Sequence, residues 1–106
     1  MKNYLGNAFS LGMILADARK GLKIAVNPLT AEEVAKTEFE SVVGHPDTAA
    51  VLTSVLGKPV AFNRVNLTLH KEERLIVAQL TNGRLPEGAT TLPEGFEFEF
   101  FEVKLE

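Results

Sequence analysis

The sequence predicts a single α/β domain of mixed α+β type, in which about five strands form a mixed sheet with helices packed on it. Three observations lead to this prediction. Helical and strand patterns alternate through residues 4–56. Residues 75–80 are almost continuously apolar, which is typical of a central strand buried on both faces. Residues 96–105 largely alternate between apolar and charged side chains, as a strand with one buried face does.

The first 28 residues predict a strand, a short helix and a second strand. Residues 4–8 have strand character, and Ser10 suits the N-cap of a short helix that extends to Ala18. Gly21 follows this helix and suits its C-terminal turn. Residues 22–26 again have strand character, and the Asn-Pro pair after them is expected to end that strand.

Two helices and a strand are expected next. Thr30 and Glu33 have the spacing of a capping box, in which each side chain bonds the other residue's backbone N–H. Residues 39–43 alternate like a short strand. Residues 46–56 give the clearest helical pattern, with Pro at the first helical position and Gly57 just past the end.

The remaining strands are expected in the second half of the chain. Residues 65–69 alternate between apolar and polar side chains, which predicts a half-buried strand before the central one. Residues 84–95 read as a loop. In the closing strand the apolar face switches between Phe100 and Phe101, so a β-bulge or a change of partner is expected there. The glutamates of this strand, including Glu102, are expected to face solvent.

Composition limits the kinds of partner. The chain has 106 residues, which is the size of one domain, and no linker or repeat divides it. The formal net charge of −3 argues against long nucleic acid as a ligand, since such binders usually carry a basic stripe. No apolar run is long enough to span a membrane, and the N-terminus lacks a signal-peptide pattern, so a cytoplasmic location is expected.

Size also predicts self-association. A chain this short buries only about two-thirds of its unfolded surface, and it has no Cys with which to form a disulfide. The apolar closing strand offers further surface that a second copy can cover. We therefore expect a homodimer.

No metal or cofactor is expected. There are two His, no Cys, and no His, Cys or Asp spacing typical of a metal site. The glycine-rich phosphate loops of common nucleotide-binding folds are also missing.

A small set of polar residues can carry chemistry. Gly44-His45 stands at the start of the clearest helix, where an imidazole would lie beside free backbone amides, which bind phosphate well; His45 can equally serve only as a helix cap. Arg64 and Arg84 can bind phosphate through two parallel hydrogen bonds, although Arg84 can instead form a surface pair with Glu87.

The order of these residues resembles a known family, the viral ring nucleases, which are type III anti-CRISPR proteins. The resemblance covers essentially the whole chain and rests on four segments: Leu5-Gly6-Asn7-Ala8-Phe9-Ser10, Gly44-His45, Asn63-Arg64-Val65 and Arg84-Leu85-x-Glu87-Gly88. The closing strand, which ends in Phe100-Phe101-Glu102-Val103, also fits. This chain departs from the family pattern by placing Pro46 directly after His45.

The resemblance implies an activity and a site. The family forms homodimers that hold cyclic tetra-adenylate (cA4) in one shared pocket and cut it without a metal, yielding linear di-adenylates with 2′,3′-cyclic phosphate ends. The carried-over catalytic residues are His45 as proton donor, Arg84 as stabiliser of transition-state charge, and Glu87 as the residue that positions the ribose or Arg84 or assists deprotonation. The carried-over substrate-binding residues are Asn7, Ser10, Gly44 and Arg64.

Two other functions remain possible at this point. One is a cA4-binding sponge, because a small displacement of the imidazole by Pro46 would cost roughly 100-fold in rate. The other is a small viral adaptor that binds a protein through its exposed apolar strand. Thermal stabilisation by cA4 separates these, since an adaptor is expected to show none.

Overall fold

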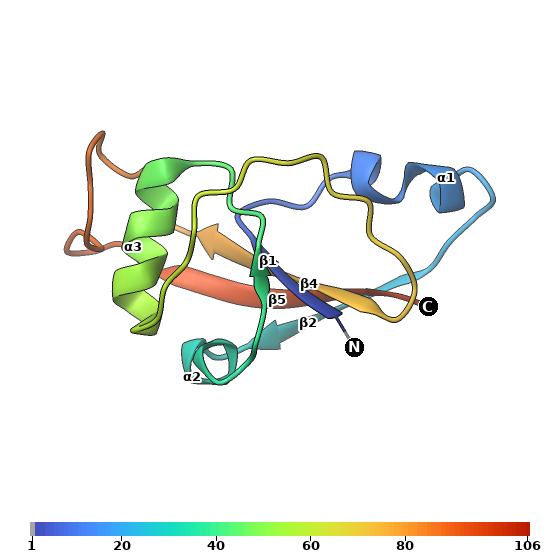
Figure 1. Ribbon diagram of the computed structural model, residues 1–106, viewed down its shortest axis with the longest axis horizontal. Coiled ribbons are helices and arrows are strands. Elements are labelled where there is room, and N and C mark those ends of the chain that lie inside the picture. Colours follow the sequence, from blue (N-terminus) through green and yellow to red (C-terminus); the bar gives the residue numbers. More distant parts are fainter. Residues whose placement is uncertain (1) are drawn as a thin grey trace.

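A computed structural model describes residues 2–106 (Figure 1). Five strands form one sheet in the order β2-β5-β4-β1-β3. The elements in chain order are β1 (Lys2–Gly6), the 3-10 helix η1 (Leu11–Ile14), α1 (Leu15–Ala18), β2 (Ile24–Leu29), α2 (Ala31–Ala35), β3 (Glu40–Ser41), α3 (Pro46–Leu56), β4 (Glu73–Leu80) and β5 (Phe98–Leu105).

The sheet is mixed, as the sequence predicts. Strand β1 runs parallel to both β3 and β4, whereas β5 runs antiparallel to β4 and to β2. Strand β4 is central, and its residues 75–78 are all buried. The prediction of a central strand with two buried faces is confirmed.

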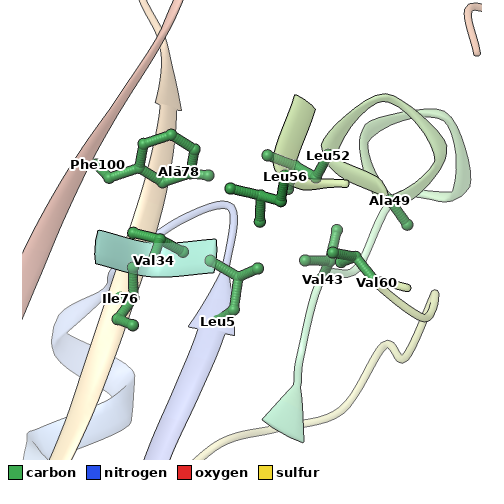
Figure 2. Close-up of a cluster of buried hydrophobic side chains, with 10 residues drawn as sticks. All are labelled: Leu5, Val34, Val43, Ala49, Leu52, Leu56, Val60, Ile76, Ala78 and Phe100. Carbon is green, nitrogen blue, oxygen red and sulfur yellow. The ribbon is translucent and has the colours of Figure 1, made fainter. Parts of the chain in front are cut away.

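Both faces of the sheet are covered. Neighbouring residues of a strand point to opposite faces, and Leu75 and Ile76 accordingly belong to different apolar clusters. The first cluster joins one face of the sheet to α2 and α3; Figure 2 shows Leu52 and Leu56 of α3 within it. The second cluster joins the other face to η1 and to Leu69.

The two-sided cover explains the pattern of β5 and corrects one expectation. Phe100 lies in the first cluster, while Val103 and Leu105 lie in the second. The register between β4 and β5 is unbroken from the Arg74 pair to the Leu80 pair. The predicted bulge or change of partner is therefore wrong: the strand pairs continuously with β4, and its two halves bury opposite faces.

The exposure expected for Glu102 is also wrong. Only 9% of this residue is exposed, because its carboxylate pairs with the guanidinium of Arg74 at 3.2 Å and with the Lys104 ammonium at 3.6 Å. Burial of a carboxylate is tolerated where cations and hydrogen bonds compensate for lost hydration.

The strand predicted at residues 65–69 does not form. Within the described residues, the only β-bridge of this region joins Phe62 to Val43. The alternating pattern arises because an extended segment packs over the sheet: Leu69 is buried, and its N–H donates to the carbonyl of Met13 at 2.8 Å. Conversely, β2 continues through Pro28 to Leu29, which is permitted because β2 is an edge strand.

The helix signals are largely confirmed. Thr30 and Glu33 form the complete capping box of α2, and α3 begins at Pro46 and ends before Gly57, which adopts φ 68°. The first helix is instead a 3-10 turn followed by a single α-turn, and Ser10 occupies its N-cap without a side-chain hydrogen bond. None of the helices in residues 2–106 has the length and apolarity needed to cross a membrane.

Candidate functional site

A cleft of about 460 Å³ opens where β1 and β4 end and α3 begins. Carboxyl ends of neighbouring parallel strands are a common position for ligand sites. Four chain segments meet there, supplying Asn7; His45, Asp47 and Thr48; Ala78, Gln79, Leu80, Gly83, Arg84, Leu85 and Glu87; and Phe98. Four of the seven predicted site residues thus share one cleft: Asn7, His45, Arg84 and Glu87.

His45 occupies the N-cap of α3. Its Nδ1 atom accepts a hydrogen bond from the Thr48 N–H at 3.3 Å, so the capping interpretation is confirmed as part of its role. In the neutral imidazole the proton then resides on Nε2, because the hydrogen bond to Nδ1 fixes the tautomer. Nε2 is the atom that remains to donate to a ligand.

The amino end of α3 is less open to an anion than the sequence suggests. Pro46 has no N–H, and the N–H of Thr48 is bonded to His45. The Asp47 carboxylate also lies in the first helical turn and already offsets the positive end of the helix dipole. Few free backbone amides therefore remain at this end of α3 for an anion.

Arg84 and Glu87 reach the cleft from the loop between β4 and β5. Among the described residues they form no ion pair with each other, so the surface pair of the alternative interpretation is not formed. The same loop is joined to α3, since the Gly88 N–H donates to Asp47 Oδ2 at 2.9 Å.

Asn7 links β1 to the start of α3. Its Oδ1 atom accepts from the Gly44 N–H at 3.2 Å, which leaves the amide nitrogen of Asn7 available to a ligand. This bond places Asn7 beside His45, although the two residues are far apart in sequence.

Three predicted substrate-binding residues lie outside this cleft. Ser10 is exposed and does not line it. Arg64 lies against Gly44, and a Cβ atom built on Gly44 would sit 3.5 Å from Arg64 Cγ. Gly44 and Arg64 therefore neighbour the cleft without lining it. Their roles in substrate binding stay predictions.

Sequence reasoning missed several lining residues. Asp47 and Thr48 follow His45 in the first turn of α3, so the helix start itself was the available signal. Gln79 is the single polar residue in the apolar run of β4. Phe98 of the closing strand both packs on the first cluster and lines the cleft.

The fold and cleft define a small α+β protein with a polar site at the carboxyl ends of parallel strands. The family model described as STIV B116-like matches residues 3–103, and the chain belongs to this family. Ten chains among solved structures match the fold. One is B116 of Sulfolobus turreted icosahedral virus, with a TM-score of 0.78, 21% identity, and coverage of 98% of this chain and 99% of that one. No curated protein sequence gives a significant match.

Proposed function

We propose that this protein is a metal-independent ring nuclease that cleaves cA4 to linear di-adenylates with 2′,3′-cyclic phosphate ends. Removal of the messenger switches off type III CRISPR signalling, and the proposed place of action is the host-cell cytoplasm. The observation that carries the proposal is the meeting of His45, Arg84, Glu87 and Asn7 in one cleft, although they come from separate segments of the chain. Membership of a family that includes a viral protein agrees with this role.

The proposed reaction requires few protein groups because the nucleophile belongs to the substrate. The Glu87 carboxylate or a water molecule takes the proton of the ribose 2′-hydroxyl, the 2′-oxygen attacks its own 3′-phosphate, the new O2′–P bond forms, and the P–O5′ bond breaks. His45 supplies a proton to the departing 5′-oxygen. Arg84 stabilises the charge that develops on the phosphate, and Glu87 orients the ribose or Arg84. The nucleophile is already adjacent, so positioning supplies much of the acceleration.

Proton donation by His45 requires a change in its hydrogen bonding. A neutral imidazole that donated its Nε2 proton would become a highly unfavourable anion, so the acid has to be the doubly protonated ring. Protonation of Nδ1 removes the acceptor for the Thr48 N–H. In the proposed mechanism, the negative charge of bound cA4 compensates for this lost cap.

The size and symmetry of cA4 suit two copies of the chain. A cleft of about 460 Å³ is the size that holds a drug-sized ligand, and a ring of four nucleotides is larger. A four-fold ring also contains a two-fold axis, so an isologous homodimer can present the same groups to opposite phosphates. Ser10 and Arg64 would then contact parts of the ring that extend beyond one chain's cleft.

A second candidate function is favoured by the capping bond of His45. If His45 keeps its bond to Thr48 when cA4 binds, the imidazole is only a hydrogen-bond donor. The protein would then be a non-catalytic sponge for the same messenger.

Chromatography of a cA4 digest carried out with EDTA tests the proposal. Ring nuclease activity yields linear di-adenylates, whereas a sponge returns intact cA4 but raises the protein's melting temperature in its presence. Intact cA4 together with an unchanged melting temperature would reject both functions and leave the protein-binding adaptor.

A further inference from the structure

The loop at residues 81–97 carries two of the proposed catalytic groups but has few bonds to the rest of the protein. Its hydrogen bonds at Thr81, Ala89 and Phe96 all stay within the loop. Figure 1 shows this orange segment beside α3. Among the described residues, the hydrogen bond that ties its middle to another element is the one from the Gly88 N–H to Asp47 Oδ2, at 2.9 Å.

The two ends of this bond lie next to the proposed catalytic residues. Asp47 is two positions after His45 in the first turn of α3. Gly88 directly follows Glu87, and its φ of 80° lies in the left-handed region that few other residues adopt. The turn at Gly88 allows its N–H to meet the carboxylate. This hydrogen bond therefore links the helix that bears His45 directly to the loop that bears Arg84 and Glu87.

We propose that Asp47 is a positioning residue that holds this loop against α3 in the geometry needed for cleavage. The effect on cleavage rests on the proposed function, whereas the effect on the loop does not. Asp47 touches neither the scissile phosphate nor the ribose in this scheme; it acts through Gly88.

The charge of Asp47 fits a role in positioning the loop better than a role in binding the substrate. A carboxylate in a cleft for a polyanion repels phosphate, so binding alone would favour a neutral side chain here. The carboxylate is instead suited to accept a strong, charge-assisted hydrogen bond and to offset the helix dipole. Removal of Asp47 is therefore expected to slow cleavage without weakening cA4 binding.

The test compares three variants of the full chain. Asp47→Ala removes the acceptor, Asp47→Asn keeps an oxygen acceptor without the charge, and Glu94→Ala removes an exposed carboxylate from the same loop as a matched control. Amide hydrogen exchange at Gly88, measured by NMR, reports the bond directly. Single-turnover cleavage of cA4 and its dissociation constant report the consequence.

We expect Gly88 exchange to rise about tenfold in Asp47→Ala and the cleavage rate to fall roughly 10–100-fold, with cA4 binding unchanged or tighter. Asp47→Asn should restore most of the protection and the rate, and Glu94→Ala should match the wild type. Unchanged Gly88 exchange in Asp47→Ala, or a cleavage rate equal to that of Glu94→Ala, would overturn the inference. If the wild type itself leaves cA4 intact, the proposed function fails, while the exchange measurement still decides whether Asp47 holds the loop.

Discussion

The imidazole of His45 accepts a hydrogen bond from the backbone N–H of Thr48, with 3.3 Å between Nδ1 and the amide nitrogen. The same side chain therefore caps α3 and also lines the cleft. A substitution at this position can act through stability, through chemistry, or through both.

Two substitutions of His45 separate these effects. His45→Asn keeps a side-chain acceptor suited to an N-cap, whereas His45→Ala removes it. Both are expected to lower single-turnover cleavage of cA4 by roughly 10²–10⁴-fold, as loss of a proton donor does. Only His45→Ala should also reduce the free energy of unfolding, by about 0.5–2 kcal/mol. His70→Ala is the control, because His70 lies outside the cleft; loss of cleavage there, with His45→Ala active, would place the chemistry elsewhere.

Arg84 is expected to act on the transition state. Arg84→Ala should lower the cleavage rate by roughly 10²–10³-fold, since it removes a preorganised stabiliser of developing charge. Arg84→Lys should recover little, because an ammonium lacks the two parallel donors of a guanidinium. The matched control is Arg19→Ala, which removes the same charge from an exposed site at the end of α1. Equal losses at both positions would mean that only net charge matters.

Cleavage is expected to be insensitive to chelators. Among residues 2–106, no group of three His, Cys, Asp or Glu side chains lies close enough to hold a metal ion. The rate of cA4 cleavage in EDTA should equal the rate without it. Loss of activity in EDTA, with recovery on addition of Mg²⁺ or Mn²⁺, would contradict the proposed mechanism.

The protein is expected to be a homodimer at tens of micromolar. Val26 of the edge strand β2 is 54% exposed, and Ile24 beside it is 37% exposed, so apolar surface remains on the single chain. Multi-angle light scattering should give twice the mass of one chain. A monomer mass, with or without cA4, would remove the shared-pocket arrangement.

Stability should depend on Glu33 at acidic pH. The backbone N–H of Thr30 bonds the Glu33 carboxylate and holds its pKa below the ordinary value. The folded state thus favours the ionised form, so this stabilisation is present above about pH 4.5 and is lost as the pH falls through the lowered pKa. The melting temperature of Glu33→Gln should fall less steeply than that of the wild type between about pH 5 and pH 3. Parallel curves would show that the capping box is not formed in solution.

Local signals in the sequence predicted the elements but not all of their partners. Pro46 and Gly57 bound α3 because their backbone preferences act at their own positions. The alternation at residues 65–69 correctly indicated a segment with one buried side, but periodicity reports side-chain burial and not backbone pairing. Burial of Glu102 depends on Arg74, which is 28 residues away. No local pattern contains that relationship.

The residues of the candidate site likewise include some that the sequence identified and some that it did not. His45 was recognisable as a helix cap, and Arg84 and Glu87 were recognisable through family resemblance. Asp47 was missed because its importance lies in the bond to Gly88, 41 residues later. The bond from the Gly44 N–H to Asn7 likewise spans 37 residues. Contacts of this kind depend on the three-dimensional path of the chain.

The position of β5 also determines when the sheet can be completed during protein synthesis. This strand lies between β2 and β4, so until the ribosome has released residues 98–105 the sheet lacks an inner member. Strands β2 and β4 then expose unpaired edges, which favour aggregation. Strand pairs so distant in sequence form slowly because a long loop must close first. The cleft, which includes Phe98 at the start of β5, is therefore complete only after translation of this strand.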